Sequence, residues 1–128
     1  MNKILKTLCL AALMATATTT AQAVEAQHTF EVGKGSFMLD GKPFVVKAAE
    51  VHYPRIPRPY WEHRIKMCKA LGMNTLCLYV FWNIHEQREG EYDFTGQNDV
   101  AEFCRLAQKN GMYVIVRPGP YVCAEWEM

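Results

Sequence analysis

The sequence predicts an α/β fold whose main strands form a parallel sheet. Three apolar runs typical of buried strands recur at intervals of roughly thirty to forty residues, at Val45–Val51, Asn74–Trp82 and Met112–Val116. Between them lie two stretches whose apolar residues repeat with helical spacing. Strand, helix and strand in this order are typical of βαβ units, and the strands that such a unit joins are parallel.

The first element along the chain is a predicted export signal at Met1–Ala23. Lys3 and Lys6 precede an apolar stretch of about ten residues, and Ala21–Ala23 offers the small-x-small pattern that signal peptidases cleave. A membrane-spanning helix needs about twenty apolar residues, so we expect cleavage and no transmembrane segment in the mature chain. The protein is therefore expected in the periplasm or outside the cell, with residues 24–128 belonging to one domain.

Composition excludes several classes of function. Half of the 128 residues are hydrophobic and 21% are charged, which is typical of a globular protein and not of a disordered chain. Two of the 14 Lys and Arg residues lie in the leader. The remainder therefore has 12 basic and 13 acidic residues. Because no basic excess is available to neutralise phosphates, nucleic acid is not an expected partner.

The spacing of cysteine and histidine gives no sign of a metal site or a disulfide framework. Four cysteines follow the leader inside apolar periodic segments, and we expect them to be buried small hydrophobes: Cys68, Cys77, Cys104 and Cys123. No Cys-x-x-Cys pair occurs, and no histidine lies at ligand spacing from a cysteine. We therefore expect neither a metal nor a cofactor.

Residues 29–46 are predicted to form a short β-hairpin ahead of the parallel strands. Phe30 and Val32 alternate with polar neighbours, and Gly33–Gly35 makes a turn before a second extended run. The dipeptide DG at 40–41 is a strong signal for a tight turn, after which the chain returns.

Two helices are predicted between the parallel strands. The first begins near Pro59 and ends at Gly72, and its apolar face consists of Trp61, Ile65, Cys68 and Leu71. The second begins near Asp99 and ends at Gly111, and its apolar face consists of Val100, Phe103, Cys104 and Ala107. Residues 83–97 are expected to join the second strand to this helix as a polar loop.

Two architectures are common for such a chain, a doubly wound sheet and a (β/α)8 barrel. No Gly-x-Gly-x-x-Gly follows the first strand, and Gly33–Gly35 lies in the hairpin, so dinucleotide binding has no support. About three βα units cannot close an eight-stranded barrel, which takes about 250 residues. We therefore expect the chain to be the N-terminal portion of a larger fold.

Ligands in parallel α/β folds bind beyond the carboxyl ends of the strands. Aromatic and charged residues gather at the three predicted ends, namely Glu50, His52, Tyr53 and Arg55, then Tyr79, Phe81, Trp82, Asn83, His85 and Glu86, and finally Arg117, Tyr121, Cys123, Glu125 and Trp126. This mixture suits a sugar, whose C–H faces stack on rings and whose hydroxyls bind charged groups. The alternative is that the rings belong to the core and the charges are solvated.

Glu50 and Glu86 are candidates for a catalytic carboxylate pair, since most glycosidases use two carboxylates. Glu86 lies between His85 and Gln87 in a polar loop, so a hydrogen bond that anchors the loop is an equally good interpretation. The sequence alone assigns a catalytic role to neither glutamate.

Four strings of residues carry a family resemblance: HYPR at 52–55, YVFWNIHE at 79–86, GEYDFTG at 90–96 and RPGPYVCAEW at 117–126. In this order they resemble glycoside hydrolase family 35, the secreted β-galactosidases of the retaining type. The resemblance runs from about Phe30 to the end of the sequence. It implies a (β/α)8 TIM barrel that removes terminal β-linked galactose, with one glutamate as acid/base and another as nucleophile.

Residue by residue, the resemblance implies where the sugar binds. Tyr79 matches the family's sugar-contacting tyrosine after the second strand. Cys123, Ala124 and Glu125 match the segment that borders the galactose, with the glutamate binding its hydroxyls. The expected partner is a β-galactoside or a galactose-containing glycan.

The chain departs from the family pattern at the catalytic residues. In the family the acid/base lies in a Gln-x-Glu-Asn-Glu string after the fourth strand and the nucleophile on a later strand, and neither string occurs here. We expect both catalytic glutamates beyond Met128, and an N-terminal fragment that is inactive by itself. Alternatives are a non-catalytic sugar-binding remnant, a relic reading frame without a folded product, and another barrel glycosidase with a different sugar preference.

Overall fold

The computed structural model describes residues 28–119 and 122–123 of the chain. The predicted export signal at 1–23 lies outside the described residues, as do Ala124 and Glu125. The strands are β1 (Phe30–Val32), β2 (Phe37–Leu39), β3 (Lys42–Phe44), β4 (Ala48–Glu50), β5 (Thr75–Val80) and β6 (Tyr113–Pro118). The helices are α1 (Trp61–Ala70), α2 (Trp82–His85) and α3 (Val100–Lys109).

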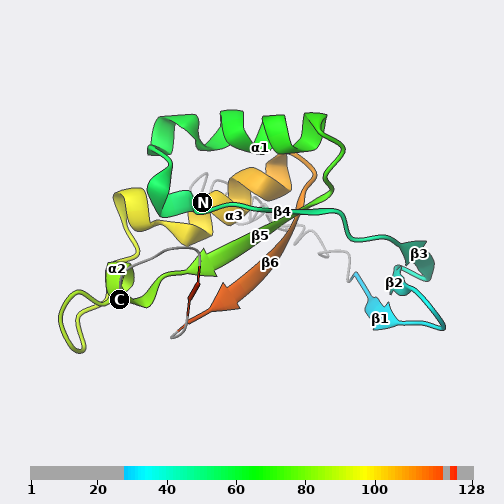
Figure 1. The fold of residues 1–128 in the computed structure, drawn as a ribbon, viewed down its shortest axis with the longest axis horizontal. Coiled ribbons are helices and arrows are strands. Elements are labelled where there is room, and N and C mark those ends of the chain that lie inside the picture. The colour runs from blue at the N-terminus through cyan, green and yellow to red at the C-terminus, as the bar shows by residue number, and fades with distance from the viewer. Residues whose placement is uncertain (1–27, 120–121, 124–128) are drawn as a thin grey trace, which may run out of the picture.

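The strands form two separate sheets, and the α/β class predicted from the sequence is confirmed (Figure 1). The first sheet is antiparallel in the order β1-β2-β3, so the predicted hairpin is a three-stranded meander. Its second turn consists of Asp40 at φ 51° and Gly41 at φ 73°. Two successive positive φ angles are those of a type I′ turn, whose twist matches that of an antiparallel pair.

The second sheet is parallel in the order β4-β5-β6, with β5 in the centre. Helices α1 and α3 lie together on one face of it (Figure 1). The side chains on that face form the main core, and Leu76 and Leu78 of β5 are fully buried there. Alternate residues face the other side, where Glu50 is in register with Cys77 and Tyr79 with Arg117.

Helix α1 confirms most of its predicted apolar face. It begins two residues after Pro59, because residues 58–60 form a 3-10 turn, and Trp61 and Ile65 are fully buried. The prediction for Leu71 was wrong, since this side chain is 74% exposed. Leu71 follows the last helical residue, so it no longer lies on the stripe that faces the sheet.

Helix α3 confirms its predicted start and end. The Asp99 side chain caps it by accepting a hydrogen bond from the backbone N–H of Glu102 at 2.8 Å. Phe103 and Ala107 are buried against the sheet. Gly111 follows at φ 67°, in the left-handed region that glycine adopts at helix ends.

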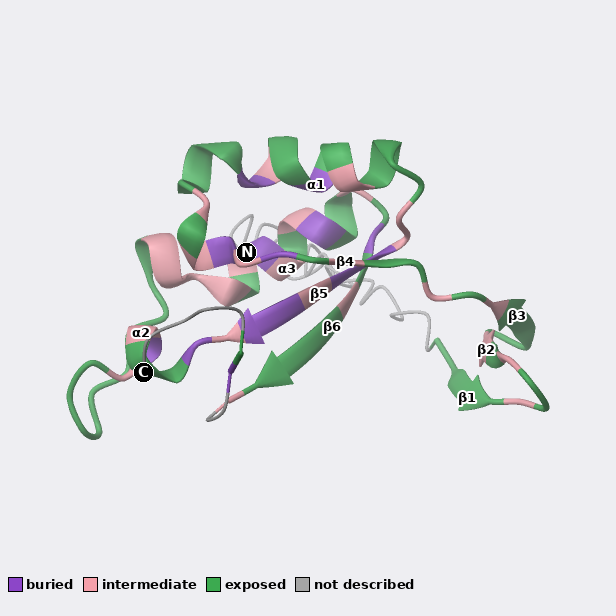
Figure 2. Cartoon of the chain, in the orientation of Figure 1, coloured by how far each residue is buried: buried purple, intermediate pink, exposed green. Residues whose placement is uncertain are grey.

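Two further predictions needed correction. The segment after β5 contains the short helix α2 within the region expected to be a polar loop. Strand β6 was expected to be buried, yet Tyr113, Ile115 and Val116 are 41 to 50% exposed (Figure 2). The reason is that β6 forms an edge of the described sheet, and the helices contact it mainly on the side of Val114. No helix among the described residues is long and apolar enough to cross a membrane.

Candidate functional site

The candidate site lies at the carboxyl edge of the parallel sheet, on the face that the helices leave open. Three side chains reach it from three neighbouring strands, Glu50 from β4, Tyr79 from β5 and Arg117 from β6. Because their strands are parallel and adjacent, residues 29 to 67 positions apart meet at one edge. This is the edge at which parallel α/β folds bind ligands.

Tyr79 and Arg117 make the closest contact within this edge. Nη1 of Arg117 donates a hydrogen bond to the Tyr79 hydroxyl at 2.5 Å. The guanidinium carbon also lies 4.0 Å from the centre of the Tyr79 ring, which is a cation–π distance. Tyr79 is only 5% exposed, whereas the Arg117 side chain is 48% exposed. The arginine is therefore the more exposed partner of this pair.

Glu50 links Arg117 to a histidine. Its Oε2 lies 3.5 Å from Nη1 of Arg117, and its Oε1 accepts a hydrogen bond from Nε2 of His52 at 2.9 Å. Arg55 donates to the other ring nitrogen of His52, Nδ1, at 3.3 Å. An arginine can only donate, so Nδ1 is the acceptor and the hydrogen of the neutral ring is on Nε2. The carboxylate of Glu50 is thus held between a cation and an N–H donor.

A small apolar cluster supports this group from behind. It consists of Tyr79, Phe81 and Val122, with Ile84 packed against them. The ring of His52 meets Tyr79 and Phe81 edge-on, with centroid distances of 5.6 and 5.3 Å. Because Val122 is buried in this cluster, the chain beyond β6 returns to the same edge of the sheet.

The predicted sugar-binding residues fall partly within the described structure. Tyr79 is at the site, and Cys123 directly follows the buried Val122. Cys123 is exposed, so its expectation as a buried small hydrophobe was wrong, because only its neighbour faces the cluster. Cys68, Cys77 and Cys104 are half-buried. Ala124 and Glu125 lie outside the described residues, and their place at the site stays a prediction.

The hypothesis that Glu50 and Glu86 form a catalytic pair finds no support, because the two carboxylates have separate partners. Glu86 accepts hydrogen bonds from the indole N–H of Trp82 and from the backbone N–H of Gly90, the latter at 2.8 Å. The Gly90 hydrogen bond lowers the pKa of the Glu86 carboxyl below its usual value. A general acid at neutral pH needs a raised pKa, so Glu86 anchors its loop, the alternative considered from sequence.

Tyr53 and His85, both candidates at strand ends, are part of the core. The Tyr53 hydroxyl hydrogen-bonds to Nε2 of His85, and Nδ1 of His85 donates to the carbonyl of Asp93 at 2.8 Å. Phe94 stacks on the His85 ring at a centroid distance of 4.4 Å. Burial raises the pKa of Tyr53 far above its usual value, so the hydroxyl stays protonated. For these two residues the core interpretation is correct.

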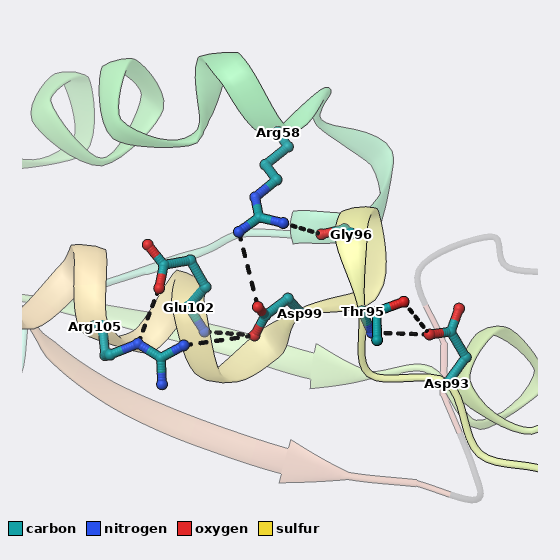
Figure 3. A network of polar contacts seen from close by, with 7 residues as sticks. All are labelled: Arg58, Asp93, Thr95, Gly96, Asp99, Glu102 and Arg105. Carbon is teal, nitrogen blue, oxygen red and sulfur yellow. Dashed lines mark hydrogen bonds and ion pairs between the residues drawn. The ribbon is translucent and has the colours of Figure 1, made fainter.

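Sequence reasoning missed Gln97, which fixes the proline loop after β4. Its side-chain N–H groups donate to the carbonyls of Tyr53, Pro54 and Ile56, and its Oε1 accepts from the backbone N–H of Arg58. A polar residue in a polar loop carries no pattern that would reveal this role. The Arg58 side chain continues the contact to the carbonyl of Gly96 at 3.1 Å and to Asp99 at 3.8 Å (Figure 3).

The described residues offer no cluster for a metal ion. No group of three or more His, Cys, Asp or Glu side chains in residues 28–119 and 122–123 is arranged to hold one. The site built from Glu50, His52, Tyr79 and Arg117 instead presents hydrogen-bonding groups around an aromatic ring.

Comparison with known proteins places these residues in context. The family model for glycosyl hydrolases family 35 matches residues 36–128. A β-galactosidase of Xanthomonas manihotis is 48% identical over 103 residues, and one of Mus musculus is 47% identical over 104, each alignment covering 80% of this chain. A β-galactosidase of Canis lupus familiaris is 40% identical over 98% of the chain. The chain spans 16 to 19% of the length of these relatives.

Proposed function

The chain belongs to glycosyl hydrolases family 35, and on that basis we propose that it forms the N-terminal part of a retaining β-galactosidase. The reaction is the hydrolysis of terminal β-linked galactosyl residues from a glycan. The observation that carries this proposal is the identity of 40 to 48% with proteins named β-galactosidase, over 80% or more of the chain. The family model spans residues 36–128, which include the strand ends that form the candidate site.

The proposed architecture is the first part of a (β/α)8 barrel. In the described part of the chain, helices α1 and α3 cover one face of the three parallel strands β4, β5 and β6, and no helix covers the other. In such barrels helices surround the outside, and the opposite face of the strands lines the interior. The open face, with Glu50, Tyr79 and Arg117 at its carboxyl edge, would then be the interior and the mouth of the barrel.

We assign galactose binding to Tyr79, Cys123, Ala124 and Glu125. Support for Tyr79 is its place at the carboxyl edge of β5, with its hydroxyl at the open face. Support for the segment that follows Val122 is the packing of Val122 on Tyr79, which brings the chain to the same edge. A glutamate there would accept hydrogen bonds from sugar hydroxyls, which charge makes stronger than neutral ones.

Catalysis is proposed to need residues outside this sequence. A retaining glycosidase needs two carboxyl groups about 5 Å apart, one as nucleophile and one as acid/base. Glu86 anchors a loop, and Glu50 contacts Arg117 and His52, so we assign neither of them to these roles. Residues 1–128 alone are therefore expected to hydrolyse no β-galactoside.

The protein is also proposed to be exported, with Met1–Ala23 as its cleaved signal. N-terminal sequencing of the protein secreted from cells that express the intact gene tests this directly. The expected first residue is Val24. A mature protein that still begins at Met1, in the cytoplasmic fraction, would contradict the proposal.

The activity is tested with the complete reading frame that contains this sequence. We expect hydrolysis of p-nitrophenyl β-D-galactopyranoside with retention at the anomeric carbon, and little hydrolysis of the β-glucopyranoside. A preference for the glucoside would indicate a different barrel glycosidase. Calorimetry of residues 24–128 with galactose tests the alternative of a sugar-binding remnant, for which a Kd below about 1 mM would be expected.

A further inference from the structure

We propose that Arg117 is a positioning residue that sets the direction of the Tyr79 hydroxyl toward the sugar, and that Glu50 holds Arg117 in place. The proposal rests on the proposed function, since it takes Tyr79 to contact the galactosyl ring. It assigns to Arg117 and Glu50 a role that acts through Tyr79 and not on the sugar.

The first step concerns which group donates. A phenol hydroxyl has one hydrogen to donate, whereas a guanidinium group can only donate. In the 2.5 Å hydrogen bond between them, Arg117 is therefore the donor and the oxygen of Tyr79 the acceptor. The hydrogen of the Tyr79 hydroxyl is left for another partner. Arg117 thus makes Tyr79 a donor toward an oxygen of the ligand, such as a sugar hydroxyl.

The second step concerns how the tyrosine is fixed. Arg117 contacts the same side chain twice, through Nη1 at the hydroxyl and through its guanidinium carbon, 4.0 Å from the ring centre. The planar guanidinium group can stack and donate at once, which the point charge of a lysine cannot do. His52 and Phe81 also pack against the ring, with centroid distances of 5.6 and 5.9 Å. The ring is therefore held by packing, while the hydroxyl is directed by the arginine.

The third step concerns what holds the arginine. Its side chain is 48% exposed within the described part of the chain, so packing alone does not restrain it there. Glu50, two strands away, brings its Oε2 to 3.5 Å from the same Nη1 atom. Glu50 is in turn oriented by Nε2–H of His52 at 2.9 Å. Contacts across β4, β5 and β6 thus lead from Glu50 through Arg117 to the Tyr79 hydroxyl.

A double-mutant cycle in the complete enzyme tests the proposal. The variants are Arg117→Gln, Tyr79→Phe and the pair, and the measurement is kcat/KM for p-nitrophenyl β-D-galactopyranoside. We expect Arg117→Gln to lower kcat/KM by about 10- to 100-fold in the wild-type background, since charge-assisted hydrogen bonds are strong. In the Tyr79→Phe background the same change should lower it by less than about 3-fold, because the hydroxyl is already absent.

The outcomes distinguish a positioning role of Arg117 from direct contact with the substrate and from general support of the fold. Losses that multiply in the double variant would mean that Arg117 contacts the substrate itself or supports the fold generally, and would overturn the proposal. Arg64→Gln, at an exposed position of α1, is the matched control and should leave kcat/KM unchanged. Glu50→Gln should lower kcat/KM by about 3- to 10-fold, and that loss should vanish in the Arg117→Gln background.

A second variant covers the case in which Arg117→Gln does not fold. Arg117→Lys keeps the charge and loses the planar stack, so it should retain the wild-type melting temperature and still show the loss of kcat/KM. Full activity in Arg117→Lys would overturn the proposal. A folded wild-type enzyme without β-galactosidase activity would overturn the proposed function instead, so the two failures are distinct.

Discussion

The Tyr53 hydroxyl and Nε2 of His85 form a buried hydrogen bond that connects the loop after β4 to helix α2. Nδ1 of His85 donates to a carbonyl, so Nε2 of the neutral ring must accept, and Tyr53 must donate. Both side chains are buried, with His85 3% exposed. Two loops that follow neighbouring strands are therefore fixed to one another just below the site.

Tyr53→Phe should destabilise the complete protein by about 1–3 kcal/mol, because it leaves the Nε2 atom of His85 buried without a donor. The free energy of unfolding in urea measures the effect. Tyr60→Phe is the matched control. Because Tyr60 is 58% exposed, this substitution should change the free energy of unfolding little. Equal effects of the two substitutions would mean that the buried hydrogen bond contributes nothing specific.

The cap of helix α3 gives a second prediction. Asp99→Ala should lower the free energy of unfolding by about 0.5–2 kcal/mol, because the backbone N–H of Glu102 loses its acceptor. Asp99→Asn keeps the capping oxygen and removes only the charge, which lies 3.8 and 3.9 Å from Arg58 and Arg105 (Figure 3). Long ion pairs with solvent-exposed arginines contribute little, so Asp99→Asn should have nearly the free energy of unfolding of the wild type. A loss in Asp99→Asn as large as in Asp99→Ala would show that the ion pairs dominate.

The stabilisation that the loop after α2 provides should depend on pH through Glu86. The pKa of this carboxyl is lowered from about 4.5 chiefly by the hydrogen bond from Gly90, so the folded protein favours the charged form. The stabilisation is fully present above pH 4.5 and is lost as the pH falls through the lowered pKa. The difference in melting temperature between wild type and Glu86→Gln should therefore be constant near neutral pH and shrink below pH 4.5.

Glu89→Gln is the control for that measurement. It removes one acidic charge from the same exposed loop and leaves the hydrogen bonds to Trp82 and Gly90 in place. Its melting temperature near neutral pH should therefore fall less than that of Glu86→Gln. A Glu86→Gln difference that grows as the solution becomes more acidic would contradict the assigned direction.

An aromatic contact joins the antiparallel sheet to β6. Phe44 meets the ring of Tyr113 edge-on at a centroid distance of 5.1 Å. A double-mutant cycle with Phe44→Ala and Tyr113→Ala should give a coupling free energy of about 0.5–1.5 kcal/mol. Phe44→Ala combined with Tyr60→Ala should be additive, since no contact joins these rings among the described residues. Additivity of both pairs would mean that the meander does not pack on β6 in solution.

The elements that could be predicted from the sequence are those set by local patterns. Trp61 and Ile65 share a helical stripe, and Gly111 ends α3 because its φ of 67° favours glycine. The pairing of Arg117 with Tyr79 was not predictable, because it depends on the register between two strands, and the two residues lie 38 positions apart in the sequence. The strand ends could be named as the site, but the partner of each side chain could not.

Burial was the least predictable property. An apolar run such as 112–116 indicates a strand, but its exposure depends on which neighbours cover it. Leu71 shows the same limit within one helix, since a shift of one residue past the helix end removes it from the core. Periodicity therefore predicts which element forms, and tertiary contacts decide which of its faces is covered.

The open face of β6 gives the last prediction. Tyr113 and Ile115 line a hollow of about 790 Å³ together with Phe30, Phe44 and other apolar residues. Apolar surface of this kind exposed to water favours association and binds hydrophobic dyes. Residues 24–128 on their own should therefore bind anilinonaphthalene sulfonate and unfold without a sharp calorimetric transition.

Ile115→Lys distinguishes an open face from a covered one. In residues 24–128 alone, where Ile115 is 41% exposed, the lysine should reduce dye binding and improve solubility. In the complete protein, where this face would line the barrel, the same lysine should be buried without a partner and cost several kcal/mol. Val45→Lys, at an exposed position between the two sheets, should be tolerated in both proteins. If the complete protein tolerates Ile115→Lys as well as it tolerates Val45→Lys, this face of β6 is open in it too, and the barrel proposed for the whole chain is wrong.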